Sequence, residues 1–391
     1  MKFNNAFKDI ISNIETNGTV EQPRDLKVKE LTVQQFVFDS KMPIADFESR
    51  SFNFKYFAGE LVWYLNRDRD VNYISNFSNF WSHITNPYTN QINSNYGSLL
   101  FGEQLEWVVK SLRLDKNTRQ AIAFLNQPKF QFAGNKDFVC TMYLNFWIRD
   151  NKLHMKVQMR SNDIFYGLTF DAPFFSFVHQ HVRLWLLDTY KDLELGDYHH
   201  CVDNVHFYER HFDLANNILS ESNNQGNDYG FELTETFFDI DDLTHEMELT
   251  NHGRNFITAV NNALESEAKK SEYYNILSEY LNIKKFWWYM KSSIPTFTMR
   301  IGAEDLFETP VLEEEQFYKR LVQFIETNLK SNYKELVLCY LEDDEGNFSE
   351  ATLEEDGYFK SLNKCIEYYS EEEKYEICTH IKKLIEKYGL Q

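Results

Sequence analysis

The sequence lacks several features that would place it in common protein classes. No apolar run approaches the 18 or so residues that a membrane-spanning helix needs. The first residues, MKFNNAFKDIISNIETNG, contain neither an apolar core nor a small-residue cleavage site, so we expect no signal peptide. The five cysteines are scattered, odd in number and without CxxC spacing, which argues against a disulfide framework and a zinc site. These absences predict a cytoplasmic protein with no membrane association and no metal.

Basic residues are also scarce. The chain has 40 Lys and Arg against 60 Asp and Glu, a formal net charge of −20. Binding to nucleic acid depends on clustered Lys and Arg, so we expect no nucleic-acid partner. A locally basic pocket for one small phosphorylated ligand remains compatible with this charge. The 391 residues, 43% hydrophobic and 16% aromatic, suffice for one large domain with an appendage, or for two or three small domains.

The clearest local pattern is a β-hairpin over residues 138–160. FVCTMYLNFWI and LHMKVQMR flank a polar RDNK turn, and apolar residues alternate in the second arm. A further strand is indicated at 29–39. Helical spacing is typical of 55–85, 99–113 and 172–190, with a loop at 86–95.

A composition break divides the chain. Residues 220–230, SESNNQGNDYG, are polar and contain glycine, so we place a linker there. The prediction is a domain over 1–219 and an acidic, mainly helical extension over 231–391. The extension shows no phosphate loop or metal-spaced cluster. Two roles stay open for it: structural or oligomer-stabilising support, or docking of partner enzymes.

Cys140 is the first candidate for chemistry. It lies in a strand-like run, and the hairpin would bring it close to Arg160. A guanidinium favours the thiolate, which is the nucleophilic form of cysteine. The alternative is a small buried hydrophobe, which is the commoner role for one cysteine in an apolar strand.

Several segments together are similar to one family. The segment MRSNDIFYGLTFD resembles the nucleotide-binding signature of thymidylate synthases and phage deoxycytidylate hydroxymethylases, in which a catalytic cysteine precedes the Arg-Ser by the spacing seen here. Other segments that resemble the family follow in its order: GELVWYL (59–65), FW (80–81), INSNYG (92–97) and DNVHFYERHF (203–212). The resemblance covers about residues 20–215. It implies an α+β thymidylate synthase-like fold, whose mixed β-sheet forms a dimer interface with helices on its other face, followed here by the mostly helical extension. A phage-encoded chain would act in the host cytoplasm.

The resemblance implies roles for the reacting residues. Cys140 would add to C6 of the pyrimidine, and Glu60 and Tyr96 would organise water and move protons. Trp81 would shape the pocket of the co-substrate, 5,10-methylenetetrahydrofolate, and Asp163 would hydrogen-bond its pterin. Each has an ordinary structural alternative, such as a core aromatic, a solvated helix position or a turn residue.

It also implies residues that bind the nucleotide. Arg160 and Ser161 would hold the 5′-phosphate, for which a planar guanidinium is suited. His206 and Tyr208 would bind the deoxyribose 3′-hydroxyl, unless the histidine is a satisfied core residue. Family members contribute an arginine pair across a homodimer; here Arg119 is retained, and Gln120 stands in the second place. The Arg24 region is only loosely similar to the family's N-terminal phosphate loop, and the closing C-terminal tail is not recognisable.

Asp171 decides the expected base. Synthases carry asparagine at this position, whereas an ionised carboxylate only accepts hydrogen bonds and suits the exocyclic amine of cytosine. The alternative is a helix N-cap. Thr141 stands where synthases have histidine, as in the hydroxymethylases. The resemblance therefore implies a dCMP hydroxymethylase that lets water add to the transferred methylene. A dUMP hydroxymethylase, a thymidylate synthase and an inactive scaffold are the alternatives.

Overall fold

The computed structural model describes residues 3–23, 26–85, 91–221, 227–240, 247–286, 318, 322, 325–326, 329, 338–342, 348–352, 355–371 and 374–389. The chain forms two compact units, Met1–Trp287 and Trp288–Gln391. Among the described residues, none of the helices combines the length and apolar character that crossing a bilayer requires.

A mixed seven-stranded sheet forms the centre of the first unit, as the sequence predicts. The strand order is β1-β2-β8-β6-β5-β4, and β7 pairs with β8 outside this path. Strands β6 and β7 run parallel to β8, and the other pairs are antiparallel. The strands are β1 (Thr19–Glu21), β2 (Val28–Phe38), β4 (Ile122–Phe124), β5 (Thr141–Arg149), β6 (Lys152–Met159), β7 (Asn162–Asp163) and β8 (Glu194–Tyr208).

The predicted hairpin is formed by β5 and β6. Asp150 and Asn151 connect the two strands, with φ angles of 49° and 59°. Two consecutive positive φ values fit the tight hairpin turn whose twist matches that of the strands, and Asp and Asn tolerate this conformation. The alternating apolar residues of β6 are buried, and they are Leu153, Met155, Val157 and Met159.

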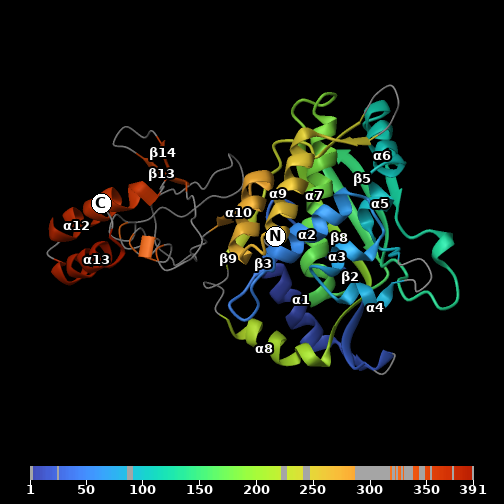
Figure 1. Ribbon diagram of the computed structural model, residues 1–391, viewed down its shortest axis with the longest axis horizontal. Coiled ribbons are helices and arrows are strands. Elements are labelled where there is room, and N and C mark those ends of the chain that lie inside the picture. Colours follow the sequence, from blue (N-terminus) through green and yellow to red (C-terminus); the bar gives the residue numbers. More distant parts are fainter. Residues whose placement is uncertain are drawn as a thin grey trace. The chain divides into compact units, whose positions relative to one another are not determined.

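Helices cover one face of this sheet. The long helix α7 packs against β6 and β8, α1 against β2, and α6 against β4 and β5 (Figure 1). The opposite face carries half-exposed side chains on β5, β6 and β8. The helices up to residue 220 are α1 (Phe3–Asn17), α2 (Phe54–Leu65), α3 (Val71–Ser75), α4 (Phe80–Ile84), α5 (Tyr96–Leu100), α6 (Glu103–Leu114), α7 (Thr169–Leu186) and α8 (Phe212–Ser220), with short helical turns at Pro128–Phe130, Ile164–Leu168 and Glu209–His211.

The expected linker at 220–230 and the chain after it, up to Trp287, belong to the first unit. Strand β9 (Asn227–Gly230) pairs with β3 (Ile44–Asp46) and β12 (Lys284–Phe286). Buried Phe237 and Phe238 add to the core, and Trp185 Nε1 donates to Phe238 O over 2.8 Å. The remaining elements here are β10 (Phe238–Ile240), β11 (Met247–Leu249), α9 (Asn251–Glu265) and α10 (Lys270–Leu281). The boundary expected at 220–230 therefore lies inside this unit, because apolar residues after it complete the core.

The second unit contains a hairpin and a helix pair among its described residues. Strands β13 (Leu338–Glu342) and β14 (Phe348–Thr352) pair antiparallel. Helices α12 (Glu355–Glu371) and α13 (Tyr375–Tyr388) pack together through buried Leu362 and Ile381. The mainly helical character expected of the C-terminal region is present in these described segments.

Candidate active site

Cys140 and Arg160 lie opposite each other at the open end of the β5–β6 hairpin. The neighbouring pair Thr141 and Met159 is in register, and Arg160 N donates to Cys140 O over 2.9 Å. Arg160 Nη2 lies 3.3 Å from Cys140 Sγ. The guanidinium also donates to the backbone oxygens of Phe138 and Val139, which fixes its orientation. The hairpin thus brings together the two side chains that the sequence predicts to be neighbours.

The electrostatic environment of Cys140 has opposing parts. Burial raises the pKa of the thiol, and the Asp171 and Asp137 carboxylates raise it further. The Arg160 guanidinium acts in the opposite direction, both through its charge and through its hydrogen bond. The net direction is upward, because removal of the sulfur anion from water outweighs one cation. Arg160 is therefore the group that lowers the pKa of the thiol against burial and the two carboxylates.

Asp171 lies in the first turn of α7, facing the same region. Its Oδ2 accepts a hydrogen bond of 2.6 Å from Asn162 Nδ2. The residue in the N-cap position of α7 is Leu168, so Asp171 does not cap the helix. Burial raises the pKa of Asp171 to about 6. A Cβ at Gly167 would lie 2.7 Å from Asn162 Nδ2, so glycine leaves room for this pair.

Two buried acceptor atoms near Asp171 have no hydrogen-bond partner among the described residues. They are Asn162 Oδ1 and Asp163 Oδ2. The other oxygen of Asp163 caps the helical turn Ile164–Leu168 by accepting from Phe165 N and Tyr166 N, at 2.7 and 2.6 Å. Asp163 is thus a turn residue as well as a ligand candidate. Because unpaired buried acceptors are costly, these two atoms favour a hydrogen-bonding ligand.

Glu60 is a buried carboxylate on α2, only 5% exposed. Tyr56, one helical turn earlier, donates its hydroxyl to Glu60 Oε1 over 2.7 Å. The Tyr56 oxygen in turn accepts from Trp81 Nε1 over 3.1 Å. Burial raises the pKa of Glu60 to about 8, despite the Tyr56 hydrogen bond, and Asp171 raises it further. A carboxyl with such a pKa exchanges protons near neutral pH.

Tyr96 is held by a loop that is tied to the Cys140 segment. It is 6% exposed, and burial raises the pKa of its hydroxyl. The charges of Asp171 and Cys140 raise that pKa further. The buried carboxylate of Asp137 accepts from Asn93 N at 2.5 Å and from Ser94 N at 2.8 Å, and also from the Ser94 hydroxyl. A Cβ at Gly97 would lie 1.8 Å from Tyr64 O, so only glycine permits this approach. Asp137 and Gly97 therefore position Tyr96.

The predicted sugar and phosphate residues lie on neighbouring strands. His206 on β8 is in register with Asp163 on β7, and its Nδ1 is 3.0 Å from Asn204 Oδ1. The ring centres of Tyr208 and His206 are 5.5 Å apart. The Arg210 guanidinium lies over the Tyr208 ring, 4.6 Å from its centre. Ser161 is half-buried between β6 and β7.

Arg119 lies apart from these residues. It is exposed in the loop between α6 and β4, and it takes part in none of the contacts above. Its expected role, in a partner subunit, stays a prediction. Arg24 lies outside the described residues.

Three residues that the sequence interpretation did not name belong to this group: Tyr56, Asp137 and Asn162. Tyr56 precedes Glu60 by four residues, which is a helical neighbour spacing. Asn162 stands within the signature itself, directly after Ser161. Asp137 had no local signal, because its partners are more than 40 residues away.

Comparison with known proteins gives consistent matches. The family model described as thymidylate synthase matches residues 5–255, more than half of the chain. A deoxyuridylate hydroxymethyltransferase of Bacillus phage SP01 is 27% identical over 220 residues, covering 52% of this chain and 56% of the relative. A deoxycytidylate 5-hydroxymethyltransferase of Enterobacteria phage T4 is 29% identical over 211 residues, covering 51% and 85%. A second deoxyuridylate hydroxymethyltransferase, of Delftia phage PhiW-14, is 30% identical over 137 residues, covering 32% and 37%. The chain thus spans little more than half the length of the SP01 relative.

Proposed function

Because this chain belongs to the thymidylate synthase family, we propose that it is a one-carbon transferase, which hydroxymethylates a deoxypyrimidine monophosphate with 5,10-methylenetetrahydrofolate as co-substrate. The products are the 5-hydroxymethyl nucleotide and tetrahydrofolate. The observation that carries the proposal is the 3.3 Å contact of Arg160 with Cys140 Sγ, with Asp171 acting electrostatically on both Cys140 and Glu60.

The Cys140 thiolate would form a bond to C6 of the pyrimidine, which leaves the electron pair on C5. That carbon then bonds to the methylene group of the co-substrate. Loss of the C5 proton and departure of tetrahydrofolate leave an exocyclic methylene, to which water adds as the Cys140 bond to C6 breaks. Glu60 suits the proton and water steps because its pKa of about 8 lets it both give and take a proton. Its partner Tyr56 fixes the orientation of the carboxyl.

We propose cytosine as the base. The carboxylate of Asp171 and the unpartnered Oδ1 of Asn162 are both acceptors, which suits the two donors of an exocyclic amine. The O4 atom of uracil would face acceptors only. A dUMP hydroxymethylase is the second candidate, since two relatives carry that name and since a neutral Asp171 acid, with its pKa of about 6, can also donate. A thymidylate synthase and an inactive scaffold come after it.

The remaining predicted residues would bind the phosphate, the sugar and the folate. Arg160 donates through Nε and Nη2 to protein atoms, which leaves Nη1 for the 5′-phosphate beside Ser161. His206 and Tyr208 would bind the 3′-hydroxyl. The unpartnered Oδ2 of Asp163 is an acceptor for pterin N–H groups, and Trp81 lines the folate side next to Tyr56.

The partner proposals concern the rest of the surface. The half-exposed sheet face opposite the helices would form a homodimer, in which Arg119 reaches the nucleotide of the other subunit. The acidic C-terminal region would support the oligomer or dock other nucleotide-synthesis enzymes. Action in the cytoplasm, of the host if the chain is phage-encoded, completes the proposal.

The test is a product assay. The full chain is incubated with methylenetetrahydrofolate and either dCMP or dUMP, products are identified by mass, and dihydrofolate is followed by absorbance. We expect 5-hydroxymethyl-dCMP, no dihydrofolate, and no turnover by Cys140→Ala. Dihydrofolate formation would indicate a synthase, and product from dUMP alone would reject cytosine. Absence of turnover with both nucleotides would favour the alternative of an inactive scaffold protein.

A further inference from the structure

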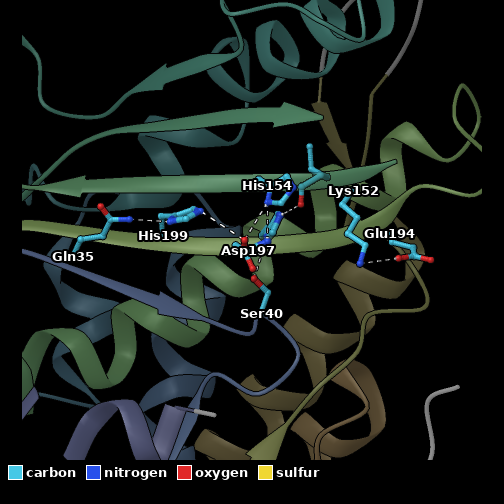
Figure 2. Close-up of polar contacts among 9 residues, drawn as sticks. Gln35, Ser40, Lys152, His154, Glu194, Asp197 and His199 are labelled. Atoms are coloured by element: carbon cyan, nitrogen blue, oxygen red, sulfur yellow. Dashed lines mark hydrogen bonds and ion pairs between the residues drawn. The ribbon is translucent and has the colours of Figure 1, made fainter. Parts of the chain in front are cut away.

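Two histidines and an aspartate meet on the half-exposed face of the sheet, away from Cys140. His154 comes from β6, and Asp197 and His199 come from β8 (Figure 2). One nitrogen of each imidazole and one carboxylate oxygen all lie within 4.8 Å of one another. None of the three residues has a role in the proposed reaction.

A β-bulge produces this arrangement. Leu153 pairs with Leu195 and Met155 with Tyr198, so Gly196 and Asp197 together oppose His154. A Cβ at Gly196 would lie 2.6 Å from His154 Nδ1, so the glycine makes room for the imidazole. The bulge thereby turns the Asp197 carboxylate toward both histidines.

The distances do not match hydrogen bonds between these side chains. His154 Nδ1 is 3.6 Å and His199 Nε2 is 3.9 Å from Asp197 Oδ2, whereas a hydrogen-bonded pair lies near 2.9 Å apart. Two atoms that bind one zinc ion tetrahedrally at about 2.0–2.1 Å lie roughly 3.4 Å apart. The observed spacing is thus closer to that of ligands around an ion.

Both imidazoles can present a lone pair toward Asp197. The backbone N–H of Asp197 donates to His154 Nδ1 over 3.0 Å, so this nitrogen is unprotonated, as a ligand must be. An ion would take the place of that hydrogen bond. On the other ring, His199 Nδ1 is 3.0 Å from the Gln35 side-chain amide. The amide atom at this distance is Gln35 Nε2, which donates to Nδ1 and leaves the ring proton on Nε2. A half-turn of the amide group lets its oxygen accept from Nδ1–H, and the Nε2 lone pair then faces Asp197.

The surroundings also hold both imidazole rings in place. Trp147 on β5 stacks on His154 at 5.5 Å and on His199 at 5.7 Å. The side chains of the two histidines are 17% and 23% exposed, while Asp197 is 60% exposed. Burial lowers the pKa of His154, which opposes a simple ion pair with Asp197 near neutral pH.

We propose that His154, Asp197 and His199 form a binding site for a divalent transition-metal ion, with zinc as the best match. Two imidazoles and one carboxylate are a donor set that zinc accepts, with a fourth position left for water or another ligand. The ion would join β6 to β8. This proposal departs from the expectation of no metal, which rested on the absence of paired cysteines. The three ligands have no local pattern, because 43 and 45 residues separate His154 from Asp197 and His199.

The test measures zinc binding by the metal-stripped, tag-free full chain in competition with a chromophoric chelator. It is done at a protein concentration of known oligomeric state, because this sheet face is also the proposed dimer contact. We expect one ion per chain, and at least roughly tenfold weaker binding by the His154→Ala/His199→Ala double variant. Cobalt should give a tetrahedral absorption spectrum that this variant lacks.

Two further variants complete the test. Asp197→Asn changes an exposed side chain, so it keeps the fold and should also weaken zinc binding roughly tenfold. Glu194→Gln is the matched control, since it removes another exposed carboxylate of β8, paired with Lys152 at 3.6 Å, and should bind zinc normally. No stoichiometric zinc in the wild type, or equal binding by Asp197→Asn, would overturn the site. Nucleotide turnover and oligomeric state are measured separately for each variant, so loss of zinc binding and loss of the proposed reaction are told apart.

Discussion

Arg160 Nη2 lies 3.3 Å from Cys140 Sγ, at the open end of a hairpin whose strands are joined by a two-residue turn. The same guanidinium is held by the backbone oxygens of Phe138 and Val139. The cation is therefore placed by the backbone of the very segment that carries the thiol. Its distance from the sulfur does not depend on a flexible surface contact.

Replacement of this cation should make the thiol less reactive. In Arg160→Met the pKa of Cys140 should rise, since Arg160 is the group that lowers it against burial. A rise of one pKa unit reduces the thiolate about tenfold below the pKa. Alkylation of Cys140 by iodoacetamide at pH 8, followed by peptide mass mapping, should slow by roughly that factor. Arg119→Met, at an exposed position, is the control, and an unchanged rate at Cys140 would contradict the electrostatic role.

The base preference should depend on Asp171. In Asp171→Asn the side-chain amide offers a donor, so the ratio of kcat/KM for dUMP to that for dCMP should rise by roughly 5- to 150-fold, as expected for about 1–3 kcal/mol. Steady-state assays with both nucleotides measure this ratio. A ratio equal to the wild-type value would show that Asp171 does not contact the base.

The same ratio should change with pH in the wild type. Asp171, with a pKa of about 6, is ionised above that pH and becomes a neutral donor below it. Preference for dUMP should therefore increase as the pH falls from 7.5 to 5.5. Asp171→Asn is the control, because it has no group to titrate there. A parallel change in both proteins would assign the effect to another group.

Glu60 should make the ligand-free protein less stable at high pH. Its carboxyl keeps its proton up to a pKa of about 8 when folded, against 4.5 when exposed to water. The folded state thus binds more protons between these values, and its stability falls as the pH rises through that window. Glu60→Gln removes this loss, so at pH 9 it should melt roughly 5 °C or more above the wild type, with a smaller difference at pH 5. Calorimetry that shows equal differences at both pH values would refute the raised pKa.

Asp137 should act on the reaction through the Tyr96 loop. In Asp137→Asn one accepting oxygen becomes a donor that faces the N–H groups of Asn93 and Ser94. We expect a loss of about 1–3 kcal/mol of stability and a lower kcat, with little change in the reactivity of Cys140. Asp115→Asn alters an exposed carboxylate that also accepts a backbone N–H, from Asn117 at 2.8 Å, and serves as the control. A normal kcat in Asp137→Asn would separate this loop from catalysis.

Prediction from the sequence was most accurate where neighbouring residues along the chain determine the structure. The β5–β6 hairpin follows from alternation and from an Asp-Asn turn, and it places Cys140 beside Arg160 without further information. The mixed sheet and the family were confirmed as well. The roles assigned to single residues stay predictions.

Long-range contacts were beyond the sequence. Asp137 meets Asn93 and Ser94 only because distant segments fold together, and the bulge opposite His154 leaves no pattern in either strand alone. The polar stretch at 220–230 has the composition of a linker, although Phe237 and Phe238 after it complete the first core. The composition of a segment predicts its exposure to solvent. It does not predict which hydrophobic core the following residues join.

The hydroxyl of Tyr56 has a single proton, with which it donates a hydrogen bond to Glu60. Its oxygen accepts a hydrogen bond from the indole N–H of Trp81. The three groups therefore form a one-way chain of dipoles, and each bond strengthens when the carboxyl at its end becomes negative. A change of charge at Glu60 would consequently be felt by the indole ring two contacts away. Tryptophan emission of the wild type, compared with that of Tyr56→Phe, would then serve as an optical reporter of ionisation inside the closed interior.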